Sequence, residues 1–302
     1  MGNHKLSGRQ KLITVLLACP VLSICAALSA APWRGAGTAD EPYLIADAND
    51  LQAVGADPNY WDACFKLTGN IDLSGFAWSD SNIIGRCYSW NDPNNQAFSG
   101  IFDGNSHAIS NLTLESDGGD IGLFGCVDGQ QAQIREVTLI NPSIVAPWDE
   151  GIVGSLVGHM DAGKIWRCGV EGSKVSGGQS AGGLVGISEG TIERCYTTGT
   201  VDNRPVAITE SGGLVGANFG VISQCSSNCR VSGAHYRGGL AGENYGRILD
   251  SHASGDVTDG LSSEFPLVGG LVGGNRDMIL RCYSTTLVGR GGLKGGWSGG
   301  AY

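Results

Sequence analysis

The apolar residues of this chain recur in short groups bounded by glycine, and they do not form the stripe expected of a helix. A five-residue unit close to Gly-Gly-Leu-Val-Gly occurs at 154–158, 182–186, 212–216, 238–242 and 269–273. Residues 122–125 and 291–295 are degenerate first and last copies. From Leu156 to Leu271, subtraction of residue numbers gives leucine spacings of 28, 30, 26 and 31. Such short, β-branched segments with glycine breaks predict strands.

A second pattern follows each unit and ends on a small residue. Copies of the form Gly-x-Ile-x-x-Cys lie at 163–168, 190–195 and 220–225; 246–251 has Ser in place of Cys, and 277–282 has Asp in place of Gly. Ile192 and Cys195 are three residues apart, so both can face the interior only if a bulge or corner lies between them. Glu193 and Arg194 would then point outward. Six residues beyond the small residue comes a valine at 201, 231, 257 and 288, whereas Val175 is one residue late.

One repeat of this size cannot bury its own apolar face, so the repeats must stack. A unit of 26–31 residues with two or three strands fits one coil of a β-helix, which rises about 4.8 Å along the axis. Equivalent Leu, Ile and Cys or Val residues would form inward ladders. The double glycines would supply a second corner or a close approach of neighbouring coils. We therefore predict an all-β fold, a parallel β-helix (β-solenoid).

These residues resemble the GLUG motif, a repeat named for its glycine–leucine–hydrophobic–glycine core and found in bacterial exported and surface proteins. The resemblance extends from about Ile121 to Tyr302. Upstream, residues 37–45, 98–105 and 109–112 are similar to the start of right-handed parallel β-helices. The resemblance implies a right-handed parallel β-helix in an exported setting, and it brings no catalytic residues with it. Some large immunoglobulin-cleaving proteases contain GLUG repeats outside their catalytic part.

The first residues have the pattern of a cleaved signal peptide. Lys5, Arg9 and Lys11 precede an apolar run at 12–27, and small residues at 29–31 offer a cleavage site. A lipoprotein signal ending at Cys19 is the weaker alternative. No later segment is long and apolar enough to span a membrane. We predict a signal peptide (1–31), an N-terminal cap with irregular first coils (32–118), the repeat array (119–289) and a truncated repeat (290–302) that acts as a C-terminal lid or a docking edge.

Charge narrows the range of partners. The formal net charge is −10, and no basic cluster offsets it. An acidic surface repels nucleic acid and anionic membranes, so we expect no nucleic-acid partner.

Four of the ten cysteines occupy the small position of the second pattern: Cys168, Cys195, Cys225 and Cys282. Ser251 replaces one member of the series, so we expect these cysteines to fill an inward stack. Disulfides between adjacent coils are the alternative. Outside the array, Cys64 with Cys87 is the disulfide that we expect. Cys225 and Cys229 have a spacing that zinc could use, but no second close pair completes a site.

Motifs of catalysis are missing or lack their context. There is no His-Glu-x-x-His, and we expect His107, His159, His235 and His252 to be turn or surface residues. Gly-x-Ser-x-Gly occurs around Ser180, Ser188 and Ser298, but no helix pattern follows, as a nucleophile elbow requires. We therefore predict no catalytic, cofactor-binding or metal-binding residues.

Acidic and aromatic residues leave alternatives open. A polysaccharide lyase or glycoside hydrolase needs a pair of carboxylates, and nothing selects one pair from Asp103, Asp117, Asp120, Asp149, Glu150, Glu189 and Glu193. The acidic turns could instead hold calcium, although a calcium-binding nonapeptide is not reproduced. Trp61, Trp78 and Trp90 are expected to pack in the cap, with stacking on sugars as the alternative.

The prediction for function is an exported structural or adhesive repeat protein, secreted or at the cell surface, without a cofactor. Its partner would be a cell-surface glycan or protein, and the C-terminal end could support self-association. The alternative is a β-helix polysaccharide lyase or glycoside hydrolase.

Overall fold

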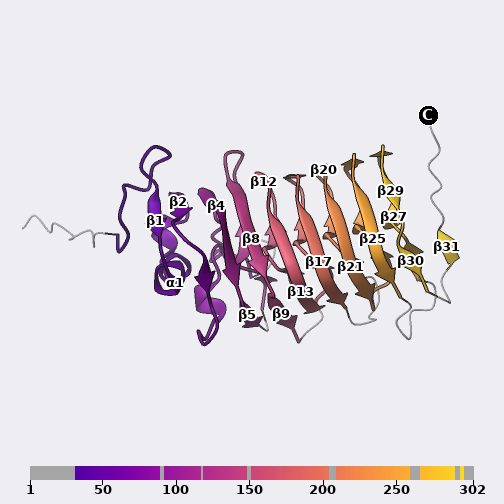
Figure 1. Ribbon diagram of the computed structural model, residues 1–302, viewed down its shortest axis with the longest axis horizontal. Coiled ribbons are helices and arrows are strands. Elements are labelled where there is room, and N and C mark those ends of the chain that lie inside the picture. The colour runs from indigo at the N-terminus through magenta and orange to yellow at the C-terminus, as the bar shows by residue number, and fades with distance from the viewer. Residues whose placement is uncertain are drawn as a thin grey trace, which may run out of the picture. The chain divides into compact units, whose positions relative to one another are not determined.

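The computed structural model describes residues 31–88, 92–116, 118–147, 151–203, 209–258, 266–289 and 293–295. The segment predicted to be a signal peptide lies outside these residues, apart from Ala31. From Pro32 on, the chain forms one compact unit. It is a parallel β-solenoid, as predicted, in which the strands of successive coils lie side by side (Figure 1).

Three parallel sheets run along the solenoid, and the longest has eighteen strands. These are β1 (Tyr43–Ile45), β2 (Cys64–Leu67), β3 (Ile71–Asp72), β4 (Ile101–Ser110), β5 (Thr113–Glu115), β8 (Gln133–Ile140), β9 (Ser143–Ala146), β12 (Lys164–Trp166), β13 (Gly169–Gly177), β16 (Thr191–Glu193), β17 (Tyr196–Asp202), β20 (Val221–Ser223), β21 (Ser226–Ser232), β24 (Arg247–Leu249), β25 (His252–Val257), β28 (Ile279–Leu280), β29 (Tyr283–Ser284) and β30 (Leu287–Val288).

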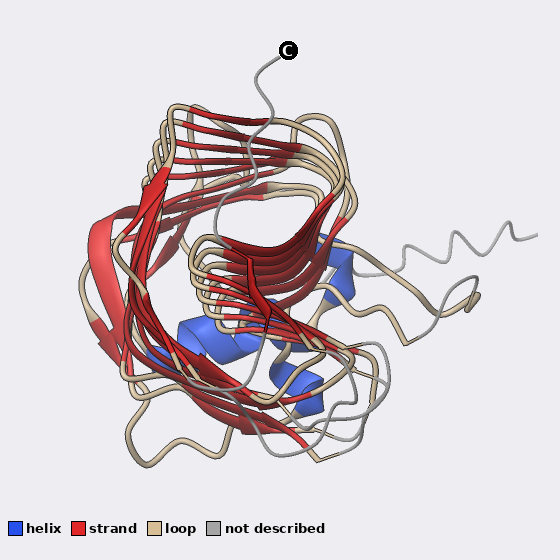
Figure 2. Cartoon of the chain, turned by 90° about the vertical axis from the view of Figure 1, so that its right-hand side faces the viewer, coloured by secondary structure: helices blue, strands red, loops and turns tan. Residues whose placement is uncertain are grey.

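The other two sheets consist of three- and four-residue strands and one two-residue strand. The seven-stranded sheet contains β6 (Asp120–Ile121), β10 (Ile152–Gly154), β14 (Ser180–Gly182), β18 (Glu210–Gly212), β22 (Tyr236–Gly238), β26 (Leu267–Gly269) and β31 (Leu293–Gly295). The six-stranded sheet contains β7 (Phe124–Val127), β11 (Val157–Met160), β15 (Val185–Ser188), β19 (Val215–Asn218), β23 (Ala241–Asn244) and β27 (Val272–Asn275). Viewed along the solenoid, equivalent strands of successive coils superimpose (Figure 2).

The corner predicted between Ile192 and Cys195 is a single residue with left-handed backbone. Arg194 has φ 56°, and the side chains of Ile192 and Cys195 are buried, at 0% and 2% exposure. The same conformation recurs at the equivalent position of the other coils, at Glu136, Arg167, Gln224, Asp250 and Arg281. An L-residue in this region costs about 1–2 kcal/mol. The burial of an apolar side chain on each side of the bend offsets that cost.

Four of the five units have three glycines, and the unit at 182–186 shows that these solve three different steric problems. A Cβ on Gly182 would overlap the carbonyl oxygen of Val185 in its own turn. One on Gly183 would overlap the carbonyl oxygen of the equivalent glycine in the next coil. One on Gly186 would lie 2.8 Å from the backbone nitrogen of Val153, in the seven-stranded sheet. The double glycine is thus both a corner and a point of close approach between coils, and the last glycine lets two sheets touch.

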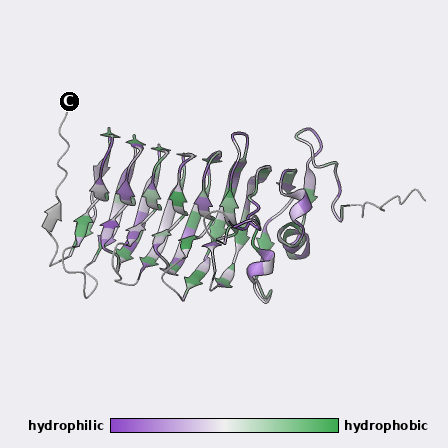
Figure 3. Ribbon diagram, turned by 180° about the vertical axis from the view of Figure 1, so that it is seen from behind, coloured by the Kyte–Doolittle hydropathy of each residue, from purple (hydrophilic) through white to green (hydrophobic). Residues whose placement is uncertain are grey.

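Inward ladders fill the core between the sheets. Leu156, Leu184, Leu214 and Leu240 are fully buried, and the predicted valine ladder pairs in register from Val175 to Val288. Val175 comes one residue late in sequence because the register between β13 and β17 shifts between Val170 and Ser173. Apolar residues recur in neighbouring strands along the solenoid (Figure 3).

The cysteine stack is confirmed as a column of free thiols, and it also bonds the backbone. Cys168, Cys195 and Cys225 are free and buried, and Cys282 is free and half-buried. The backbone N–H of Cys168 donates to Sγ of Cys195 at 3.4 Å, and that of Cys195 donates to Sγ of Cys225 at 3.4 Å. The N–H of Cys225 donates to Oγ of Ser251 at 3.0 Å. Serine can replace cysteine here because both side chains are small acceptors.

The N-terminal cap packs aromatic side chains over the first coils. It contains α1 (Ala48–Ala56), whose N-cap Asp47 accepts from two backbone N–H groups, and the short helices η1 (Pro58–Tyr60) and η2 (Asp80–Asn82). Trp61 and Trp78 are 2% and 7% exposed, which confirms the prediction of cap packing for both. Trp90, Trp148 and Trp297 lie outside the described residues.

The disulfide joins Cys87 to Cys126, so the expected pair of Cys64 with Cys87 is wrong. Two positions of the cap pair with β7 along its edge: Ile84 with Phe124, and Phe98 with Val127. The backbone N–H of Cys126 donates to the carbonyl of Gly85 at 3.2 Å, which brings the two cysteines together. Cys64 lies on β2 of the long sheet and is free. The cap therefore covers an edge that would otherwise be unpaired.

The register of β31 corrects the placement of the last repeat. Leu293 pairs with Leu267, and Gly295 pairs with Gly269, the first glycine of the preceding unit. The last copy therefore begins at Gly295 and not at Gly291. Its sequence, Gly-Gly-Trp-Ser-Gly, starts 26 residues after the previous unit, within the range of the other spacings. The preceding coil has several exposed apolar side chains: Leu267, Met278, Leu280, Tyr283 and Leu287. The lid or docking edge stays a prediction.

We expect Leu184→Asp to lower the melting temperature strongly, because it would bury an unpaired charge where the leucine is fully buried. Glu193→Ala should cost at most about 1 kcal/mol, because Glu193 lies at the outward corner and its ion pair with Lys164 is near the surface. Thermal unfolding followed by circular dichroism measures both. Equal, small effects would contradict the inward assignment of the leucine ladder.

Loss of the disulfide should destabilise the cap. Cys87 and Cys126 are separated by 39 residues, and the chain-entropy relation gives a loss of about 4 kcal/mol for a loop of this size. We expect the double variant Cys87→Ser, Cys126→Ser to unfold at lower denaturant concentration than the oxidised protein. Cys64→Ser is the matched control and should change little. A shift in the control as large as that in the double variant would contradict the assigned pairing.

Candidate functional site

A histidine and several carboxylates gather next to the disulfide, at the first coils that contain all three sheets. His159 lies on β11, and Asp120 lies on β6 in the seven-stranded sheet. Asp161 follows β11 in the turn, and Glu189 occupies the equivalent turn position after β15 in the next coil. The close packing of the two short sheets, which their glycines allow, brings Asp120 to His159.

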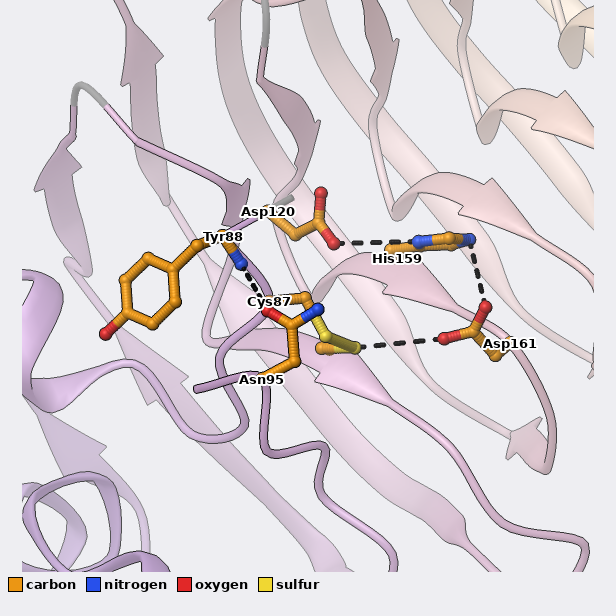
Figure 4. The surroundings of a disulfide bond; sticks show 7 residues. Cys87, Tyr88, Asn95, Asp120, His159 and Asp161 are labelled. Carbon is orange, nitrogen blue, oxygen red and sulfur yellow. Dashed lines mark hydrogen bonds and ion pairs between the residues drawn. A yellow bond between two sulfur atoms is a disulfide. The ribbon is translucent and has the colours of Figure 1, made fainter. Parts of the chain in front are cut away.

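The imidazole lies between two carboxylates (Figure 4). His159 Nδ1 is 3.6 Å from Asp120 Oδ2, and His159 Nε2 is 3.5 Å from Asp161 Oδ1. The His159 side chain is 16% exposed, whereas Glu189 is exposed. One ligand atom from each of His159, Asp161 and Glu189 lies within 4.8 Å of the others. These three residues could hold a metal ion.

Burial and mutual interaction perturb the charges of this cluster. The pKa of the His159 imidazole is lowered by burial, but the carboxylates of Asp120, Asp161 and Glu189 outweigh this effect and raise it overall. Burial raises the pKa of Asp120, although His159 opposes the shift. Burial also raises the pKa of Asp161, and the negative charge of Asp128 adds to the rise. The cluster therefore contains several carboxylate acceptors around a single imidazole.

The disulfide forms one wall of this cluster. Cys126 Sγ lies 3.9 Å from Asp161 Oδ2. A sulfur in a disulfide has no proton to donate, so this is a packing contact. The backbone N–H of Asp120 donates to the carbonyl of Cys87 at 3.0 Å, which fixes β6 against the covalent link. Nearby, the N–H of Tyr88 donates to Asn95 Oδ1 at 2.8 Å (Figure 4). The oxidised cysteines are not available as thiolate ligands.

Two of the candidate acids, Asp120 and Glu189, belong to this cluster, and others are engaged elsewhere. Asp103 pairs with Arg135 at 2.9 Å, and Glu193 pairs with Lys164 at 2.6 Å. Asp117, Asp149 and Glu150 lie outside the described residues. Ser180 and Ser188 are fully buried on strands, so neither is an exposed nucleophile, and Ser298 lies outside the described part of the chain.

The expectation for His159 is wrong, because it is a partly buried strand residue that faces carboxylates. His107 and His252 also lie on strands, whereas His235 lies outside any strand. Asp161 was missed as a candidate. The repeat alignment contained the signal, since Asp161 and Glu189 fall at the same turn position and His159 precedes Asp161 by two residues. The approach of Asp120 from another sheet has no local sequence signal.

A second pair of carboxylates lies further along the same two sheets. Glu243, on β23, is 2% exposed and pairs with Arg276 at 2.7 Å. Glu210, on β18, has a pKa raised to about 7, chiefly by burial and further by the charge of Glu243. Sequence reasoning named neither residue, because their interaction depends on the packing of one sheet on the other.

Two exposed aromatic rings, Phe219 and Tyr245, are stacked on one another in successive coils. Phe219 and Tyr245 are parallel, with ring centroids 4.6 Å apart. The Tyr245 ring, which stacks on Phe219, also contacts Arg276: the guanidinium lies 5.1 Å from the ring centroid. A sugar ring that binds an aromatic residue needs an open face. This column is therefore better explained as coil-to-coil packing.

A cavity of about 590 Å³ opens on the long sheet at the cap. Its polar lining includes Asp40, Lys66, Thr68, Asp103, Asn105 and Arg135, and the free Cys64 also contributes to it. Lys66 has no ion-pair partner among the described residues. The size lies within the range of small-molecule sites, about 300–1,000 Å³.

Comparisons with known proteins define the class. The family model of the GLUG motif matches residues 177–202 and 233–258. The chain thus contains GLUG repeats, which confirms the resemblance, and it is a β-solenoid built from them.

The relatives are much longer proteins. Over 163 residues the chain is 32% identical to halomucin of Haloquadratum walsbyi, covering 53% of this chain and 2% of halomucin. It is 34% identical over 130 residues to a glycine-rich protein of Evansella cellulosilytica that is named as a suspected membrane protein, covering 41% of this chain and 14% of the other. The chain thus shares repeat sequence with a protein named halomucin and with one named as a membrane protein.

Solved structures share the fold. A suspected immunoglobulin A1 protease from Bacteroides ovatus aligns with a TM-score of 0.59 and 22% identity, over 84% of this chain and 79% of that one. A second structure, named IgA1 protease, aligns with a TM-score of 0.60 and 20% identity, over 81% of this chain and 20% of that one. At this level of identity, the similarity concerns the fold alone. In the described residues, none of the helices reaches the length and apolarity needed to cross a membrane.

The pKa of Glu210 predicts a pH-dependent stability. Its value of about 7 in the folded protein exceeds that of about 4.3 for an unfolded chain. The folded state then binds more protons between these values, so stability falls as the pH rises from about 4.5 to 7, by at most on the order of 3 kcal/mol. Glu210→Gln should flatten this part of the melting-temperature profile, while Glu115→Gln, at an exposed strand position, should leave it unchanged. Superimposable profiles for Glu210→Gln and the unaltered protein would refute the assignment.

Proposed function

We propose that this chain is a rigid structural and adhesive segment of an exported surface protein, and that its N-terminal cap binds a saccharide. The observation that carries the structural role is the in-register stacking of the same ladders through every coil of the array. Parallel pairing links β1 to β2 and continues to β24 with β28 in the long sheet. Such a solenoid transmits its shape from coil to coil because each repeat contacts its neighbours.

The length relations support a role as one segment of a larger protein. The chain spans 2% and 14% of the two curated relatives, whose names refer to a mucin-like and a membrane protein. A repeat array within a long exported chain is well suited to hold a binding surface away from the cell. Export itself rests on the signal-peptide pattern of the first residues.

The cap cavity is the part of this surface best suited to a saccharide. Sugar hydroxyls both donate and accept hydrogen bonds, so a site needs both kinds of group. Lys66, Asn105 and Arg135 supply donors, while Asp40 and Asp103 supply acceptors. The Arg135–Asp103 pair holds two of these groups in place at 2.9 Å, and Lys66 is free to meet a ligand.

A glycan-processing enzyme is the second candidate, and the Glu210–Glu243 pair favours it. A carboxyl group with a pKa of about 7 keeps a substantial protonated fraction near neutral pH, which a general acid needs. However, Glu243 is almost fully buried and paired with Arg276, so it is poorly placed to reach a sugar ring. The adhesive role is therefore preferred.

A glycan array followed by titration calorimetry of the bound saccharide tests the adhesive proposal. We expect binding without release of reducing or unsaturated ends. Lys66→Ala should weaken binding at least about tenfold, the equivalent of one lost hydrogen bond to a charged group. Lys174→Ala, on the exposed side of β13, is the matched control and should bind normally.

Cys64 provides a second readout of the same site. It lines the cavity and is partly exposed, so a bound saccharide should slow its reaction with a thiol reagent. Binding that is unaffected by Lys66→Ala and leaves the reactivity of Cys64 unchanged would place the saccharide elsewhere. Release of sugar products that Glu210→Gln abolishes would replace the adhesive proposal with the enzymatic one.

A further inference from the structure

The cluster around His159 has the donor set of a transition-metal site. One imidazole nitrogen and two carboxylates come from His159, Asp161 and Glu189, and their ligand atoms lie within 4.8 Å of one another. Zinc is bound by imidazole and carboxylate ligands, whereas calcium takes six to eight oxygens. The imidazole therefore favours zinc over the calcium that acidic turns suggest from sequence.

The separation of the donor atoms fits a shared ion better than a direct contact. His159 Nε2 is buried and lacks a hydrogen-bond partner in the described structure, although Asp161 Oδ1 is 3.5 Å away. A charge-assisted hydrogen bond would bring these atoms to about 2.7–2.9 Å. Two ligands at about 2.0–2.1 Å from a tetrahedral ion lie about 3.3 Å apart. The observed distance is close to the second value.

Asp120 supports the imidazole from its other side. Its Oδ2 lies 3.6 Å from His159 Nδ1, beyond hydrogen-bond distance, and its negative charge favours the tautomer with a proton on Nδ1 and a lone pair on Nε2. A carboxylate on the far nitrogen is the usual companion of a metal-bound histidine. The four side chains therefore have different roles: His159, Asp161 and Glu189 are the ligands, and Asp120 lies on the far side of the imidazole.

The backbone holds these groups in fixed positions before any ion binds. His159 pairs in register with Cys126 on one side and with Ile187 on the other. Asp161 and Glu189 occupy the same turn position in successive coils, which are about 4.8 Å apart. The disulfide closes the side facing the cap, while Glu189 is exposed, so solvent or a partner can reach the open side.

We propose that His159, Asp161 and Glu189 bind a divalent transition-metal ion of the zinc type, with Asp120 orienting the histidine. The ion links two successive coils next to the disulfide that fastens the cap to the first one. With three protein ligands, the fourth position is open to water or to a ligand from another molecule.

Titration calorimetry of the purified oxidised chain with ZnCl₂ tests the site. We expect one ion per chain and a melting temperature that rises with zinc concentration, because the ion binds the folded state. His159→Gln and Glu189→Gln should each remove this binding event and the zinc-dependent rise. His252→Gln and Glu115→Gln are the matched controls, since neither residue is in the cluster, and both should retain one ion.

Asp120→Asn separates an orienting role from that of a ligand. Loss of an outer carboxylate weakens metal binding by about 10–100-fold, so this variant should keep the stoichiometry with a higher Kd. Absorption of the Co²⁺-loaded protein should show the intense visible bands of a four- or five-coordinate ion, and His159→Gln should lack them. Ca²⁺ and Mg²⁺ should not displace zinc at equal concentration.

Several results would overturn the proposal. One is zinc binding that survives unchanged in both His159→Gln and Glu189→Gln. Another is binding that disappears when Cys64 and Cys282, the half-buried free cysteines, are replaced by serine, because the ion would then be held by thiols. A preference for Ca²⁺ over Zn²⁺ would also refute it. Since Glu189 is exposed, Glu189→Gln should fold normally, and the melting temperature without metal verifies this for every variant.

Discussion

The structure depends on the close approach of backbones at the glycine columns. Where the chain turns from the seven-stranded to the six-stranded sheet, a side chain on Gly182 would meet its own turn, and one on Gly183 would meet the next coil. Gly186 lets the two sheets touch directly. This contact leaves Leu184 and its equivalents as the large side chains that fill the space inside the turn. A methyl group at Gly182 or Gly186 would meet backbone that the rest of the coil needs in contact, whereas the first unit has a fully buried serine, Ser155, at the position of Gly183.

A sharply turning parallel coil also has to satisfy backbone groups at its corners, where ladder geometry is interrupted. At the left-handed corner the cysteine column satisfies these backbone groups, because each sulfur accepts a hydrogen bond from a backbone N–H of the preceding coil. At the opposite turn, Asn218 donates through Nδ2 to Asn244 Oδ1 at 2.7 Å, and Asn244 donates to Asn275 in the same way. Small polar side chains in the core are thus part of the hydrogen-bond system, which is why Ser251 can replace one cysteine of the column without disturbing it.

The column of turn residues that contains Asp161 varies in chemistry from coil to coil. The turn position of Asp161 holds Glu189, Phe219, Tyr245 and Arg276 in the following coils. Their backbones are equivalent, so the chemistry changes from acidic to aromatic to basic along the solenoid without a change of fold. This variability explains how GLUG repeats can occur in proteins with different names, and why the motif identifies an architecture and not an activity.

The sequence by itself determined the strands, the coil length and the inward ladders. Ile192 and Cys195 predicted a corner, and the doubled glycines predicted a turn or close approach, because these features repeat locally with a fixed period. It did not determine contacts between segments that have no common period. The Cys87–Cys126 pairing depends on how an irregular cap segment lies along β7. Likewise, Asp120 lies close to His159 only because the seven-stranded and six-stranded sheets pack closely together. The same packing lets the charge of Glu243 raise the pKa of Glu210. Repetition encodes the coil, but the tertiary packing of one sheet on another decided which polar groups meet.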